Sequence, residues 1–65
     1  MYDPTNLIND IIAFEEGDID DDRLLGMFQH LVNTGMAWTL QGFYGRTAIA
    51  LIEAGHITRP DNSGN

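Results

Sequence analysis

The sequence contains no cysteine and no lysine. Without cysteine, the chain can form neither a disulfide framework nor a thiolate metal site. Ten acidic residues face three arginines, which gives a net charge of −7 at neutral pH. Such a chain repels nucleic acid and anionic membranes at long range, which argues against direct nucleic-acid binding. The acidity suits a basic partner, but it also keeps a small protein soluble, and we favour this simpler interpretation.

Long apolar runs and a basic leader segment are also missing. No stretch approaches the roughly 20 apolar residues that a transmembrane helix needs. The first ten residues, MYDPTNLIND, carry acids and a proline where a signal peptide carries basic residues and an apolar run. We therefore expect no contact with a membrane and a cytosolic location.

The residue types of catalytic and metal sites are equally scarce. The first serine is Ser63, and the two histidines, His30 and His56, do not stand at a metal-ligand spacing. The sequence shows no nucleophile that is accompanied by a base and an orienting acid. We expect a protein that is not an enzyme and that holds neither a cofactor nor a metal ion.

What the sequence does contain is the pattern of a helical protein. Asp3, followed by a proline, is typical of a helix start, and apolar residues at helical spacing predict a helix over 4–16. Asp20 is the predicted N-cap of a second helix with a well-defined apolar stripe. Gly17 and Gly35 can take the left-handed conformation in which these two helices end.

The second half of the chain predicts a short helical or 3₁₀ turn over 36–41 and a third main helix over 43–54, which we expect to be the most buried. Residues 59–65 form a polar tail that we expect to be disordered, so that residues 1–58 are a single helical domain. The predicted fold class is all-α, a small bundle of three to four helices. The candidate core residues are Leu7, Ile8, Ile11, Leu24, Phe28, Leu31, Trp38, Leu40, Ala48, Leu51 and Ile52. So small a core would gain from self-association, and a homodimer is an open alternative to a monomer.

An acidic run, GDIDDD at residues 17–22, places aspartates at alternate positions, as calcium loops do. An EF-hand loop also needs a glycine and a glutamate at its sixth and twelfth positions, where this sequence has Arg23 and Gln29. The same aspartates suit a helix N-terminus, where carboxylates cap free N–H groups and complement the helix dipole. We interpret the run as capping and leave a role for it as an acidic surface open.

The stretch GFYGR at residues 42–46 superficially resembles a phosphate-binding loop. A Walker motif needs four residues between its glycines and then a lysine, and this stretch has neither. Two roles remain for Arg46. It holds an anion at a helix start, or it pairs with the acidic face of a neighbouring helix, which is the interpretation that we favour.

Three aromatic residues, Trp38, Phe43 and Tyr44, crowd together before this arginine. Tryptophan and tyrosine are enriched at binding hot spots, because they offer rigid contact area at a low entropic cost. We favour the interpretation in which Trp38 and one other ring fill the core. In the alternative, an exposed ring anchors a partner, and the candidate partner-binding residues are then Trp38, Phe43, Tyr44 and Arg46.

The sequence from Phe28 to Ile57 includes TGMAWTLQGFYGRTA. It resembles a family of very short proteins of tailed bacteriophages whose core pattern is TGxAWxLQGxYGRxA. Position 43 is phenylalanine here, where smaller residues are usual in that family. The resemblance implies a phage origin and the cytoplasm of an infected bacterial host, and it implies no reaction.

Together, these features predict a small, acidic, non-catalytic phage protein that acts by binding a host or phage protein. Two alternatives remain open. The acidic residues between Glu15 and Asp22 could mimic nucleic acid for a basic protein, or Arg46 could bind a small anionic ligand.

Overall fold

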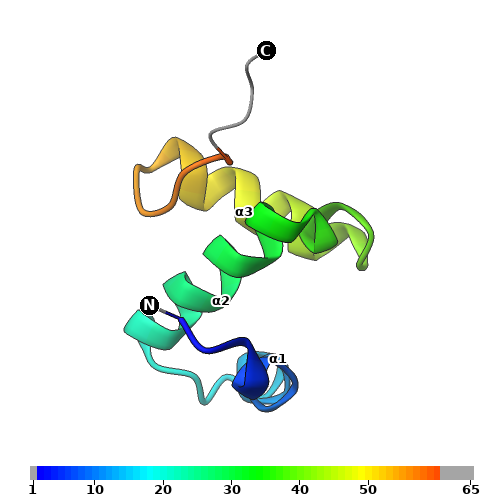
Figure 1. The fold of residues 1–65 in the computed structure, drawn as a ribbon, viewed down its shortest axis with the longest axis vertical. Helices are drawn as coiled ribbons and strands as arrows, with labels where there is room; N and C mark the ends of the chain where they lie inside the picture. The colour runs from blue at the N-terminus through cyan, green and yellow to red at the C-terminus, as the bar shows by residue number, and fades with distance from the viewer. Residues whose placement is uncertain (1, 61–65) are drawn as a thin grey trace.

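The computed structural model describes residues 2–60 and shows the all-α fold that the sequence predicts. The chain forms η1 (Pro4–Asn6), α1 (Leu7–Glu16), α2 (Asp21–Thr34), η2 (Met36–Trp38) and α3 (Gly42–Glu53). The helix α2 runs through the middle of the molecule, while α1 and α3 lie across its opposite ends (Figure 1). The short η2 packs against both α2 and α3. Most of the predicted disordered tail, residues 61–65, lies outside the described residues.

The ends of the helices follow local capping chemistry. The predicted helix over 4–16 is present, with its first turn wound as the 3₁₀ helix η1. At the start of α2, Oδ1 of Asp20 accepts a hydrogen bond of 2.9 Å from the backbone N–H of Arg23, which satisfies one of the free donors of that helix end. Gly17 and Gly35 end α1 and α2 with φ angles of 78° and 83°, a conformation that glycine adopts without strain.

The core is built mainly by α2. Phe28 and Leu31 of α2 and Ala48 of α3 are fully buried, as predicted. Our expectation that the third helix is the most buried is wrong, because α2 is the helix against which both α1 and η2 pack. The buried hydrophobic residues are Met27, Phe28, Leu31, Val32, Ala37, Tyr44, Ala48 and Ile57.

Two residues that we expected in the core are exposed. Ile8 keeps 72% of its surface accessible and Trp38 keeps 46%. The apolar residues of α1 cover two adjacent stripes of the helix, and only the stripe that contains Leu7, Ile11 and Phe14 packs against the core. Ile8 lies on the other stripe and therefore faces outward.

A buried charge determines which stripe of α1 faces inward. Asp10 is only 2% exposed, and its Oδ1 accepts hydrogen bonds from both Nε, at 3.0 Å, and Nη2 of Arg23 in α2. The hydroxyl of Tyr2 donates to the other carboxylate oxygen. Gly26 makes room for the Tyr2 ring, because a Cβ at that position would stand 2.8 Å from its Cδ1. Both carboxylate oxygens of Asp10 thus accept hydrogen bonds, as a buried carboxylate requires.

The segment after α3 returns to the middle of α2. The side-chain amide of Gln29 donates to the backbone carbonyl of Thr58 at 2.7 Å and accepts from the backbone N–H of Thr58 at 2.9 Å. The Gln29 side chain thus satisfies both the backbone N–H and the backbone carbonyl of Thr58, which have no helical partner. These two hydrogen bonds hold the neighbouring Ile57 in the core.

We expect Asp10→Asn to lower the free energy of unfolding at neutral pH by about 2 kcal/mol, because it removes the charge from the hydrogen bonds of Arg23 and Tyr2. Burial raises the pKa of Asp10, but the hydrogen bonds from Tyr2 and Arg23 outweigh it and hold the pKa below its ordinary value of 3.8. The stabilisation is therefore present above that value and is lost as the pH falls through the lower folded pKa.

Urea unfolding of the wild type and of Asp10→Asn between pH 7 and pH 2 measures this difference. The variant should lose less stability than the wild type on acidification. Asp18→Asn, which removes an exposed carboxylate, should stay within about 0.5 kcal/mol of the wild type. An acid dependence that is the same in the wild type and in Asp10→Asn would contradict the assignment.

Candidate functional site

Two of the four candidate partner-binding residues, Phe43 and Tyr44, belong to an aromatic cluster inside the molecule. Phe14 at the end of α1 meets Phe28 of α2 edge-to-face at 5.3 Å between ring centroids and stacks on Phe43 of α3 at 5.8 Å. The Tyr44 ring lies 5.6 Å from Phe14 and 4.4 Å from Phe43. These offset and edge-to-face arrangements are the favourable ones for aromatic pairs. The cluster joins α1 to α3, so these two rings hold the fold together, with Tyr44 buried and Phe43 partly buried.

The hydroxyl of Tyr44 points out of this cluster toward α1. It donates a hydrogen bond of 2.6 Å to Oε2 of Glu15. Burial raises the pKa of Tyr44, and the hydrogen bond to Glu15 and the negative charge of its carboxylate raise it further, to about 12. An acid near the end of α1 is therefore engaged in holding α3 in place.

Trp38, the third candidate, closes η2 and lies at the surface. Its ring rests on α3 at Gly45, because a Cβ at Gly45 would stand 3.5 Å from Cε3 of Trp38. The favoured interpretation, in which Trp38 and one other ring fill the core, is thus only half right. Tyr44 takes the interior position, and nearly half of Trp38 remains accessible.

Arg46, the fourth candidate, is exposed on α3. Its Nη1 would stand 3.2 Å from a Cβ on Gly42, so the side chain folds back along the first turn of the helix. The internal ion pair that we favoured for Arg46 is absent from residues 2–60, where the ion pair that forms joins Arg23 and Asp10.

The sequence analysis did not single out Ile49, which the structure places beside these residues. Arg46 and Ile49 are three positions apart on α3, and both are exposed. Gly45, which the Trp38 ring contacts, directly precedes Arg46 and lies one turn before Ile49. We call Trp38, Arg46 and Ile49 the α3 surface. A search for apolar residues at solvent-facing helical positions would have pointed to Ile49.

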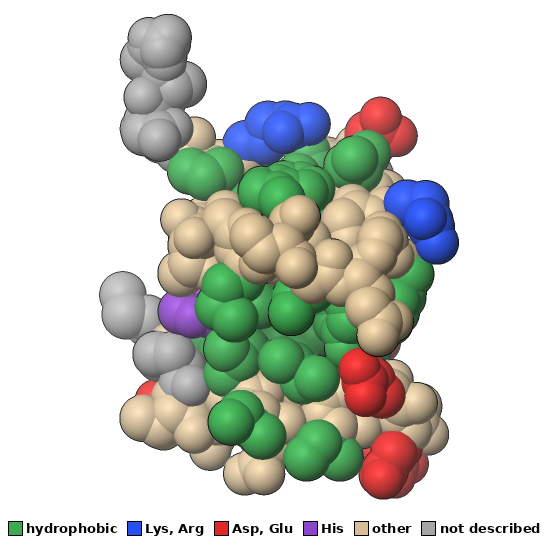
Figure 2. All heavy atoms as spheres, turned by 90° about the vertical axis from the view of Figure 1, so that its right-hand side faces the viewer, with side chains coloured by type: hydrophobic (Ala, Val, Ile, Leu, Met, Phe, Trp, Pro, Cys, Tyr) green, Lys and Arg blue, Asp and Glu red, His purple; other side chains and the backbone are tan. Residues whose placement is uncertain are grey.

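Apolar surface is a general feature of this small protein. Figure 2 shows hydrophobic side chains gathered over the middle of one face, with acidic and basic side chains at its margins. Among the large hydrophobic residues, Ile8, Ile12, Trp38 and Ile49 are the most exposed. Apolar surface of this kind that a protein leaves open often marks a site of interaction.

Residues 2–60 contain no group of three or more histidine or acidic side chains that is arranged to hold a metal ion. Nor does any helix within these residues combine the length and the apolar character that crossing a bilayer requires.

A family model covers almost the whole chain. It describes a domain of unknown function, DUF7417, and it matches residues 1–63. The chain belongs to this family. No curated protein and no solved structure matches the chain. The matched range contains the whole helical unit, from η1 to the segment after α3, and the family description names no reaction.

We expect the phenolic group of Tyr44 to ionise with a pKa of about 12 in the folded protein, instead of the ordinary value of 10. Because the unfolded chain releases this proton near pH 10, the contribution of Tyr44 to stability should be lost as the pH rises from 10 to 12. Tyr44→Phe should cost about 1 kcal/mol at neutral pH, since one hydrogen bond to an exposed carboxylate is lost.

Ultraviolet absorbance of the phenolate, followed together with circular dichroism, measures the ionisation while the fold is intact. Glu15→Gln should lower the pKa of Tyr44 only in part, because the burial of the ring remains. Ionisation of Tyr44 centred near pH 10 in a folded sample would show that the ring is not held as described.

Proposed function

We propose that this protein acts without catalysis, by binding another protein through the α3 surface. In this proposal the chain is encoded by a phage and acts in the cytoplasm of the infected bacterium. The resemblance of residues 34–48 to short proteins of tailed bacteriophages supports that origin.

The observation that carries the proposal is the position of Trp38. A tryptophan that is 46% exposed in so small a protein leaves a large apolar ring in water, although Tyr44 is buried nearby. Tryptophan and arginine are the residue types most enriched among binding hot spots. Here they stand on one surface, and the ring of Trp38 is already held in place by its contact with α3 at Gly45, which lowers the entropic cost of binding.

Arg46 adds a directional group to this apolar surface. Its guanidinium has no carboxylate partner within residues 2–60, and it can donate several hydrogen bonds in a fixed geometry to carboxylate or carbonyl oxygens of a partner. A partner that covers Trp38 and Ile49 and offers an acceptor to Arg46 would satisfy all three residues together.

Nucleic-acid mimicry finds less support. A mimic presents its carboxylates over a face at regular intervals, whereas four acids of this protein are used within the fold. Asp10 is buried against Arg23, and Glu15 accepts from Tyr44. Asp3 and Asp20 accept hydrogen bonds from backbone N–H groups at helix starts. Among residues 2–60, the remaining acids cluster near the junction of α1 and α2 or, in the case of Glu53, stand alone at the end of α3.

We expect the wild-type protein, immobilised on a resin, to retain a specific protein from a bacterial lysate at about physiological ionic strength, where weak contacts between surface charges are screened. Trp38→Ala and Arg46→Ala should each lower this retention by about ten-fold or more, because each removes a central contact. Quantitative mass spectrometry of the eluted proteins measures the change.

The matched control is Ile8→Ala, which truncates a more exposed apolar residue on the outer side of α1, away from α3. This variant should retain the partner at the wild-type level. Equal retention by all four proteins, or no specific retention by the wild type, would remove the basis of the proposal.

A further inference from the structure

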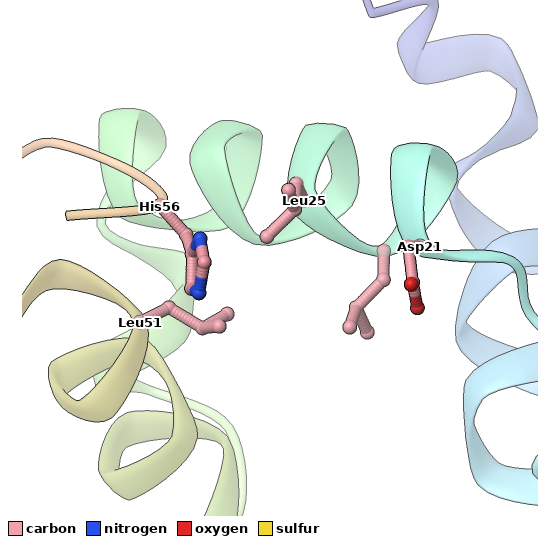
Figure 3. A pocket seen from close by; sticks show the side chains of 5 residues that line it. Asp21, Leu25, Leu51 and His56 are labelled. Atoms are coloured by element: carbon pink, nitrogen blue, oxygen red, sulfur yellow. The ribbon is translucent and has the colours of Figure 1, made fainter. Parts of the chain in front are cut away.

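A groove on α2 is separate from the α3 surface. Figure 3 shows α2 running along the groove, with Asp21 and Leu25 projecting from it, Leu51 projecting from α3, and His56 projecting from the segment after α3. Leu24 completes the lining, and the volume of the groove is about 220 Å³. Asp21 and His56 stand at its opposite ends.

The lining and the size of the groove determine what it can hold. Its three leucines are only partly buried, so they still expose apolar surface that an occupant would cover. A volume of about 220 Å³ is below the range of roughly 300–1,000 Å³ that is typical of small-molecule and cofactor sites. The groove is large enough for aliphatic side chains that a neighbouring protein inserts.

The charge at one end of the groove is strongly negative. Asp21 lines that end, and Asp18 and Asp22, three positions before it and one position after it, are also exposed. The nearest cation in the sequence, Arg23, gives its guanidinium to the buried Asp10 and is not directed to these acids. The carboxylate of Asp21 therefore attracts a cation from an occupant of the groove.

We propose that this groove is a docking site for a basic, amphipathic segment of a partner protein. The segment inserts an aliphatic side chain between Leu25 and Leu51 and places a lysine or arginine against Asp21. An amphipathic helix that lays its apolar face in such a groove is a recurrent mode of peptide recognition.

Two other occupants are disfavoured by charge and composition. A second copy of this chain would bring another net charge of −7 to an acidic rim. The C-terminal sequence Asp61–Asn65 carries an acid, no cation and no large apolar side chain, so it does not match the groove. The charge complementarity thus selects a basic partner segment.

A pair of synthetic helical peptides tests this proposal with the full 65-residue chain. Both peptides carry leucines at the same positions, and their polar positions are lysine in one peptide and glutamate in the other. At about 0.15 M salt, the lysine peptide should bind and should shift the amide resonances of Leu25, Leu51 and His56. The glutamate peptide should not bind.

The matched pair of variants is Asp21→Asn and Asp22→Asn. Both remove one carboxylate from the first turn of α2, but only Asp21 lines the groove. We expect Asp21→Asn to weaken binding of the lysine peptide by about five-fold or more and Asp22→Asn to change it by less than about two-fold. Trp38→Ala should leave it unchanged, so this test is independent of the α3 surface.

Several results would overturn the proposal. Equal losses in the two asparagine variants would show that the peptide responds to net charge and not to the groove. Binding of both peptides alike, binding of neither, or shifts confined to residues outside the groove would do the same. Resonance shifts at the groove that grow with protein concentration alone would mean that a second copy occupies it.

Discussion

The carboxylate of Asp10 is a charge in the interior of a very small protein, and much of the remaining structure depends on how it is paired. A buried carboxylate is costly unless donors surround it, and the donors here come from two other places in the chain, Tyr2 and Arg23. The helix α1 can satisfy Asp10 only in the rotation that turns it toward Arg23. That rotation also brings Phe14 against Phe28 and leaves Ile8 in solvent.

The rotation of α1 in turn determines how α3 is placed, because aromatic contacts and one hydrogen bond join the two helices. Phe14 stacks on Phe43, and Glu15, the next residue of α1, accepts a hydrogen bond from Tyr44. These contacts fix the start of α3 with Tyr44 turned inward. The opposite side of the same helix then faces outward with Arg46 and Ile49, under an exposed Trp38 ring. The buried ring of Tyr44 and the exposed ring of Trp38 are therefore only six positions apart in sequence, although one holds the fold together and the other faces solvent.

The acidic residues divide in a similar way. Some stabilise the fold: Asp20 caps α2, and Asp10 pairs with Arg23 in the interior. Others stay exposed near the junction of α1 and α2. The exposed ones leave one end of the molecule negative, next to a groove lined by leucines. The α3 surface carries an arginine instead. The chain thus has two surfaces of different character, one acidic beside partly exposed leucines and one with an arginine beside apolar side chains.

The sequence by itself determined the helices and their ends, because N-caps, glycine C-caps and helical periodicity act between residues a few positions apart. Asp20, Gly17 and Gly35 were predicted correctly for this reason. Which stripe of α1 faces inward, and which ring enters the core, was decided only by the tertiary structure. These choices depend on pairs such as Asp10 with Arg23 and Glu15 with Tyr44, which are 13 and 29 positions apart. A local sequence pattern cannot predict such a pair, because the stabilisation arises only when the two helices pack against each other.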